Sequence, residues 1–234
     1  MAPKIVLIGD DTNLLKVLRR NLDGRGYVVT IVKDEAEIYE LAHKDAPDLF
    51  ILLIANSIST SPIINLCKAL RDISQAPMIV VSSMYRDEII IQALDSGADD
   101  FISIPFSMEE FLARVRAALR RWNIFQAELR QTCANIQYGE LLIKTEARQV
   151  YVGSELITLT PKEYEVLLYL AQRKGKVITH RELLRAIWGP EYGDEREYLR
   201  VFIYQLRRKI EKDPLHPQYI QTVSGVGYRF GASD

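Results

Sequence analysis

The side chains in the first half of the chain that could do chemistry stand where apolar runs end. Asp10 and Asp11 follow the run at residues 4–9, and paired carboxylates are suitable oxygen ligands for a divalent cation. The run in "PDLFILLIAN", residues 47–56, is of a type that often ends in an acidic residue, yet Leu53 occupies that place. A leucine supplies no nucleophile for a phosphoryl group, so the sequence excludes phosphorylation at this position.

A second group of candidate residues lies in "EREYLRVFIYQLRRKI", residues 195–210. Its apolar positions follow helical spacing and are expected to face a core. These positions are Leu199, Phe202, Ile203, Leu206 and Ile210. The opposite face then carries Tyr198, Arg200, Val201, Tyr204, Gln205, Arg207 and Arg208. Such guanidinium, amide, aromatic and aliphatic groups can contact phosphates and base edges in a DNA major groove, whereas a solvated face with ion pairs is the alternative.

The hairpin "SGVGYRF", residues 224–230, favours the DNA interpretation. It places two glycines in a tight turn. Arg229 beside this turn could reach a neighbouring minor groove, where the negative potential attracts guanidinium groups.

Other chemistries find little support. The histidines His43, His180 and His216 are dispersed, and the two cysteines are too far apart for zinc ligation at short spacing. Cys67 is expected in a core, whereas Cys133 falls in the presumed connection between domains, where a redox-sensing thiol and an inert one both remain open. Neither a GxGxxG nor a GxxxxGK[ST] phosphate loop is present. We therefore expect no enzyme, no metal and no cofactor.

Five short apolar runs alternate with helical patterns in the first half and must position these side chains. They lie at residues 4–9, 27–32, 48–54, 77–82 and 100–104. Continuous apolar runs of this length indicate strands covered on both faces. The order (βα)5 predicts an α/β fold with a doubly wound parallel sheet, in which functional side chains gather at the carboxyl ends of the strands.

The sequence pattern of the second half predicts short strands, three helices and a final hairpin. The helices are expected near residues 162–173, 180–188 and 195–211. Capping boxes support three helix starts, at Ser107 with Glu110, Thr160 with Glu163, and Thr179 with Glu182. The predicted division is a domain at residues 1–121, a linker at 122–135 and a second domain at 136–234.

Composition and charge are those of an ordinary globular protein. The chain has 234 residues, of which 48% are hydrophobic and 26% charged, enough for two domains. No early apolar run is long enough for a signal peptide or a membrane span, so we expect a cytoplasmic protein without membrane contact. Residues 1–121 carry 14 Lys and Arg against 17 Asp and Glu, and residues 122–234 carry 16 against 14. The basic excess therefore lies in the half that contains the candidate DNA-binding helix.

Three long motifs of the second half carry a resemblance. They are "LTPKEYEVLLYLAQRKGKVITHRELLRAIWG", "YLRVFIYQLRRKIEKDP" and "IQTVSGVGYRF". Together they resemble the winged-helix DNA-binding domain of OmpR/PhoB-type response regulators over nearly all of residues 136–231. The resemblance implies that the helix at about 196–211 is the recognition helix and that Arg229 is the minor-groove residue of the wing. It also implies phosphate contacts from Trp188, Thr222 and Tyr228. Core packing is the alternative for Trp188 and Tyr228.

The motifs "KIVLIGDD", "PDLFILL" and "SGADDFISIPF" resemble the receiver domain of the same regulators over residues 4–121. In such receivers acids after the first strand hold magnesium, an aspartate at the end of the third strand accepts the phosphoryl group, and a lysine neutralises it. Here Asp10 and Asp11 match an acidic cluster whose first position is Gly9. Leu53 replaces the acceptor and Ile104 replaces the lysine.

The resemblance therefore implies an atypical receiver with a degenerate site. Ser82 matches the family's hydroxyl position and Phe101 its aromatic position. Leu53 and Ile104 are expected to pack where the charged pocket would have been, a burial that stabilises by about 1 to 3 kcal/mol per side chain.

The family pairs receivers through the fourth helix, the fifth strand and the fifth helix. The corresponding residues are Ile90, Ile91, Leu94, Asp99, Asp100, Leu112, Arg114 and Arg116. Ile91, Leu94 and Leu112 are expected to form the hydrophobic centre. The charged rim would be Asp99 with Arg116 and Asp100 with Arg114. Ile90 replaces a basic residue, which leaves Glu110 without its expected partner.

We therefore expect a constitutive C2 homodimer that binds promoter DNA at tandem half-sites about one helical turn apart. Double-stranded DNA is the expected main partner, and RNA polymerase a further one. A switch that uses another acid, or a bound ligand, is the alternative.

Overall fold

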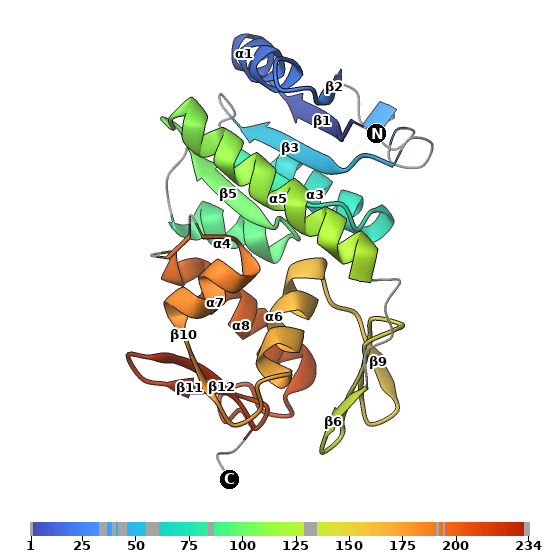
Figure 1. Ribbon diagram of the computed structural model, residues 1–234, viewed down its shortest axis with the longest axis vertical. Coiled ribbons are helices and arrows are strands. Elements are labelled where there is room, and N and C mark those ends of the chain that lie inside the picture. Colours follow the sequence, from blue (N-terminus) through green and yellow to red (C-terminus); the bar gives the residue numbers. More distant parts are fainter. Residues whose placement is uncertain are drawn as a thin grey trace. The chain divides into compact units, whose positions relative to one another are not determined.

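The computed structural model describes residues 2–32, 37–38, 41, 46–54, 61–83, 87–128, 135–190, 192–193 and 195–231, with the backbone alone at 61–63 and 124–128. The chain divides into two compact units, Met1–Asn123 and Ile124–Asp234 (Figure 1). Cys133 lies outside the described residues.

The first unit is a five-stranded parallel sheet. Its strands are β1 (Lys4–Gly9), β2 (Val28–Val32), β3 (Leu49–Ile54), β4 (Met78–Ser82) and β5 (Asp100–Ser103). They lie in the order β2-β1-β3-β4-β5, the doubly wound arrangement that the apolar runs predicted. Four helices of this unit are described, α1 (Thr12–Asp23), α3 (Ser61–Ile73), α4 (Asp87–Asp95) and α5 (Met108–Glu128).

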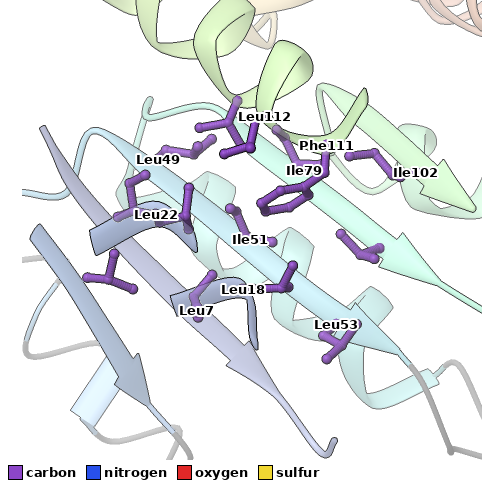
Figure 2. Packing of buried hydrophobic residues seen from close by; sticks show 14 of the residues in the cluster. Leu7, Leu18, Leu22, Leu49, Ile51, Leu53, Ile79, Ile102, Phe111 and Leu112 are labelled. Carbon is purple, nitrogen blue, oxygen red and sulfur yellow. The ribbon is translucent and has the colours of Figure 1, made fainter. Parts of the chain in front are cut away.

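One face of this sheet carries the main core cluster. Leu15, Leu18 and Leu22 recur at helical spacing on α1 and pack on this face together with the apolar side of α5. Figure 2 shows Phe111 and Leu112 of α5 over the strand residues, with side chains of α1 in the same cluster. Successive strand residues point to opposite faces, so this cluster takes every second residue of β1, β3 and β4.

In the second unit the described residues form two antiparallel sheets and three helices. The four-stranded sheet has the order β6 (Ile136–Tyr138), β7 (Leu141–Lys144), β8 (Gln149–Val152) and β9 (Glu155–Ile157). The helices are α6 (Pro161–Ala171), α7 (His180–Ile187) and α8 (Arg196–Ile210). The second sheet has the order β10 (Val177–Thr179), β12 (Gly227–Phe230) and β11 (Ile220–Val223). This winged-helix arrangement confirms the predicted fold class, although the sequence did not predict β6 and β10.

Side-chain caps mark where α5, α6 and α7 begin. Thr160 and Glu163 form the complete predicted capping box of α6. Thr179 accepts a hydrogen bond from the Glu182 backbone N–H and so caps α7. At α5, Ser107 accepts from the Glu110 backbone N–H as predicted, but the Glu110 carboxylate bonds Arg114.

Two glycines shape the hairpin between β11 and β12. Gly225 has a φ of +73° at the turn, a conformation that residues with side chains rarely adopt. Gly227 begins β12, where a Cβ would overlap with the backbone oxygen of Ile178 in β10. The first glycine therefore makes the turn, and the second allows β10 and β12 to approach.

Candidate nucleic-acid interface and strand-end site

Helix α8 buries the face that its sequence predicted. Leu199, Phe202, Ile203, Leu206 and Ile210 are at most 3% exposed. Tyr198 and Val201, which the sequence placed on the opposite face, are also buried. That part of the prediction was wrong, because these two side chains lie at the margins of the apolar stripe.

The exposed face of α8 is narrower than predicted. Arg200 and Arg208 are exposed, as is Tyr204, which is 55% accessible. Gln205 is half-buried. The guanidinium of Arg208 lies 5.8 Å from the centre of the Tyr204 ring, so cation and aromatic group stand together on this face. A face with these groups can contact phosphates and base edges.

Arg207 points toward the hairpin. Its guanidinium donates to the backbone oxygen of Ile220 through Nε at 3.0 Å and through a terminal nitrogen at 2.7 Å. The same terminal nitrogen donates to Thr222 Oγ1 at 2.8 Å. Burial lowers the pKa of Arg207 from its ordinary value. The sequence proposed Arg207 as a groove contact, but its donors already hold the first strand of the hairpin.

Glu211 fixes the chain between α8 and β11, and the sequence analysis did not single it out. Its carboxylate accepts hydrogen bonds from the backbone N–H groups of Gln218, Tyr219 and Ile220, at 2.8, 2.9 and 2.9 Å. Charge-assisted bonds of this kind are stronger than neutral ones. Together with Arg207, Glu211 ties the end of the helix to the start of the hairpin.

Arg229 is not at the tip of the hairpin. It lies within β12, opposite Gln221 of β11 and Val177 of β10, and donates to Gln221 Oε1 at 2.8 Å. The turn itself consists of Ser224, Gly225 and Val226, which are exposed and uncharged. The sequence placed Arg229 beside the turn as the residue that would reach the minor groove. The structure places it in the central strand of the sheet, between β10 and β11.

Trp188 and Tyr228 both pack within the second unit. The Trp188 ring centroid lies 5.1 Å from that of Phe202, and Trp188 is 3% exposed. Tyr228 lies edge-on to His180 with 5.4 Å between ring centroids, and burial raises its pKa. Both residues therefore pack in the core, as the alternative for them predicted. Thr222 is exposed, lies opposite Tyr228 in the β11–β12 ladder and accepts a hydrogen bond from Arg207.

The carboxyl end of β3 in the first unit is apolar. Leu53 is fully buried in the core cluster at the end of β3 (Figure 2), and Ile104 and Phe106 pack against the same cluster. Gly9 faces Leu53 across the β1–β3 ladder. A Cβ at position 9 would lie 2.7 Å from Leu53 Cβ and 2.8 Å from its backbone oxygen. The position therefore has no room for an acidic side chain.

The polar residues near this edge have other roles. Asp11 is the N-cap of α1 and accepts from the backbone N–H groups of Asn13 and Leu14. Asp10 is exposed, whereas Ser82 and Phe101 are buried. Among the residues that the structure describes, no group of three or more His, Cys, Asp or Glu side chains could hold a metal ion.

The charged residues assigned to a dimer rim are paired within one chain. Asp99 accepts from Arg71 at 2.7 Å and from the Met78 backbone N–H at 2.8 Å. Asp100 pairs with Arg114, which also bonds Glu110. Glu110 therefore has Arg114 of its own chain as a partner, while position 90 supplies no basic side chain for it. Asp99 is not free for Arg116, whose side chain is exposed.

The apolar residues assigned to the same interface differ in exposure, since some are buried in their own domain and one is exposed. Leu94 and Leu112 are 4% and 1% exposed, and Leu112 belongs to the core cluster of its own domain. Ile90 is buried as well, whereas Ile91 is 39% exposed. The predicted centre of three residues was therefore wrong for Leu94 and Leu112, and Ile91 alone of the three presents an apolar surface.

The buried cysteine and the hydropathy of the described helices point to no further functional site. Burial raises the pKa of the Cys67 thiol to about 12, which makes it an inert core residue. Within the described part of the chain, no helix has the length and apolarity that a membrane crossing requires.

A parallel-sheet domain followed by a winged-helix domain with a cationic helix face defines a DNA-binding transcriptional response regulator. The family model "Response regulator receiver domain" matches residues 5–116, and "Transcriptional regulatory protein, C terminal" matches residues 153–230. The chain belongs to the OmpR/PhoB-type response regulators, which combine these two domains.

Relatives of full length support this assignment. The transcriptional regulatory protein KdpE of Mycobacterium tuberculosis is 40% identical over 228 residues, which covers 97% of this chain and 99% of that protein. The KDP operon transcriptional regulatory protein KdpE of Escherichia coli is 35% identical over 230 residues, covering 97% and 98%. The solved structure of a RitR mutant is 26% identical in sequence, with a TM-score of 0.76 and coverage of 99% of this chain and 100% of that one. The two relatives are named as transcriptional regulators.

Proposed function

We propose that this regulator binds promoter DNA as a homodimer without aspartyl phosphorylation at the end of β3. The observation that carries the proposal is the full burial of Leu53 among aliphatic side chains. Phosphorylation of a receiver requires a carboxylate nucleophile, and this position supplies none. Two further positions differ from a phosphorylated receiver in the same way. Position 9 has no room for an acidic side chain, and Ile104 packs against the core cluster where the family has a lysine.

The proposed dimer is a C2 pair formed through α4, β5 and α5. Ile91 supports this face because it is an exposed isoleucine on α4, next to exposed Gln92. Arg116 adds an exposed cation on α5. The pairs Arg71–Asp99 and Arg114–Asp100 hold β5 against the neighbouring helices within each protomer, with side chains at most 14% exposed. These pairs therefore set the shape of the face and are not its rim.

The proposed DNA contact places α8 in the major groove, with Arg200, Tyr204 and Arg208 toward the bases and phosphates. Trp188, Thr222 and Tyr228 would then face the backbone. Arg207 and Glu211 hold the hairpin in a fixed position relative to α8. The KDP operon promoter from the same genome is the first DNA to test, since the relatives from two organisms carry the name KdpE.

The decisive experiment combines three measurements on the purified full-length chain. Sedimentation at micromolar concentration without a phosphodonor is expected to give a dimer. Incubation with acetyl phosphate and Mg²⁺ is expected to leave the intact mass unchanged, and DNA affinity is expected to be equal before and after this treatment. A phosphoryl adduct that strengthens DNA binding would instead establish a switch at another acid. A monomer that binds no DNA would remove the proposal altogether.

A further inference from the structure

Glu197 lies at the N-terminal end of the exposed face of α8. It stands in the first turn of the helix, and its side chain is 58% exposed. Residues three or four apart share one face of a helix, so Glu197 lines up with Arg200, Tyr204 and Arg208. The buried residues Leu199 and Leu206 lie on the opposite side. The first turn of a helix in this position is the part that contacts base edges in helix-turn-helix proteins.

Glu197 is paired with a residue proposed to read DNA. Arg200 donates to Glu197 Oε1 at 2.6 Å, and the Arg200 side chain is 67% exposed. Exposed pairs of this kind add little to stability. In the structure one terminal nitrogen of the Arg200 guanidinium is directed at this carboxylate, and most of the five N–H donors of Arg200 remain available for another acceptor. Glu197 keeps a second carboxylate oxygen for a further donor.

A carboxylate on this face restricts what the helix can approach. Phosphate oxygens and an ionised carboxylate are both acceptors, so Glu197 cannot contact the DNA backbone. A carboxylate buried in the groove without a donor is costly. In the major groove, guanine presents only acceptors and thymine an acceptor and a methyl group. Cytosine presents the N4 amino group as a donor and has no acceptor beside it, so a carboxylate can bond it without repulsion. Adenine also presents a donor at N6, but its acceptor N7 lies next to it and repels a carboxylate.

We propose that Glu197 is a specificity-determining residue that selects a cytosine in each half-site, next to a guanine read by Arg200. This inference rests on the proposed docking of α8 in the major groove. It adds that the negative charge on the helix rejects guanine and thymine at one position.

The test is selection of bound sites from a randomised double-stranded DNA library by the full-length chain. The wild-type protein is expected to fix a cytosine at one position, and thymine there should weaken binding on the order of tenfold. Glu197→Gln is expected to move the preference to adenine, because an amide can bond both N6 and N7. Glu197→Ala should accept all four bases at that position and bind non-specific DNA more tightly.

A matched control removes the same charge elsewhere in the domain. Glu155 is exposed on β9, and Glu155→Gln is expected to leave every base preference unchanged. If Glu197→Gln selects the same base as wild type at every position, the inference is overturned. Arg200→Ala separates this failure from failure of the docking. If Arg200→Ala loses the preference for guanine, the docking of α8 in the major groove is supported. If Arg200→Ala and Tyr204→Ala both bind DNA as the wild type does, the docking is overturned and the inference with it.

Discussion

Arg207 and Thr222 are joined by a 2.8 Å hydrogen bond between the helix α8 and the first strand of the hairpin. The two further bonds from Arg207 to the Ile220 backbone oxygen make this contact a fork. The cation therefore acts inside the domain, where it sets the distance between the two elements that are proposed to enter DNA.

Replacing Arg207 should affect DNA binding differently from replacing its neighbour. Arg207→Ala is expected to destabilise the domain by about 1 to 2 kcal/mol, because the buried Ile220 oxygen loses its side-chain donor. It should also lower DNA affinity with an unchanged salt dependence. Arg208→Ala should reduce the slope of log K against log salt by about 1, as expected for a lost phosphate contact. Equal changes of slope in titrations of the two variants would contradict this division.

Gly9→Ala should destabilise the first unit. The added Cβ would lie 2.7 Å from Leu53 Cβ, so β1 or β3 must shift. Overpacking of this kind costs about 1 to 3 kcal/mol, which denaturant unfolding would measure. Gly24→Ala is the control in the same domain, because its nearest neighbour would be 3.3 Å away and its φ is −63°. Equal losses in the two variants would count against the steric account.

Leu53 should behave as a core residue and not as a signalling residue. Leu53→Ala is expected to lower the free energy of unfolding by about 2 to 5 kcal/mol, and the volume-conserving Leu53→Met by less than about 1.5 kcal/mol. At a temperature where both variants are folded, their DNA affinities should match that of wild type. A folded Leu53→Met variant with altered DNA affinity would show that this position communicates with the second domain.

Ile91 should control dimerisation without controlling stability. It is 39% exposed on α4, so Ile91→Glu removes little from the core but places a charge in the proposed interface. Sedimentation should then show a monomer, with an unchanged unfolding midpoint of the monomeric domain. Val17→Glu places the same charge at an exposed apolar position of α1, outside the proposed interface, and serves as the control. A fully dimeric Ile91→Glu protein would place the interface elsewhere.

The stability of the second unit should depend on pH through His180. Burial, with Arg196 and Arg200 nearby, lowers the pKa of His180 in the folded domain. The unfolded chain therefore binds more protons as the pH falls below about 6.5, and stability decreases there. Unfolding of wild type and His180→Asn at about pH 7.5 and about pH 6 should show a larger loss for wild type.

Asp213 offers an internal comparison for this pH effect. The hydrogen bond from His216 lowers the pKa of the Asp213 carboxyl, so its contribution is lost only as the pH falls below the ordinary Asp value of about 4. The pH range in which Asp213 loses its contribution therefore lies below the range in which His180 does. An equal loss in wild type and His180→Asn between the two test conditions would assign the effect to other groups.

The sequence could predict the elements because their signals are local. The apolar runs predicted all five parallel strands, and the spacing of Leu199, Phe202 and Leu206 predicted the buried face of α8. The capping box of Thr160 and Glu163 marked a helix start correctly. In each case the information lies within a few residues of the feature.

The errors concern side chains whose roles depend on distant partners. Arg207 bonds Ile220, which is 13 residues away in the sequence, and Asp99 bonds Arg71, which is 28 residues away. No local pattern reports such contacts. Leu112 was placed on a surface although it completes the core between α5 and the sheet. Glu197 was missed despite a local signal, since it stands three residues before Arg200 on the face opposite the apolar stripe.

The contact between Gly9 and Leu53 also constrains how this chain can evolve. An acid gained first at position 9 would collide with the side chain and the backbone oxygen of Leu53. An acid gained first at position 53 would be a lone charge among aliphatic groups. Each single step passes through a less stable protein, so selection for folding alone opposes the gain of an acidic cluster at this strand end by single substitutions.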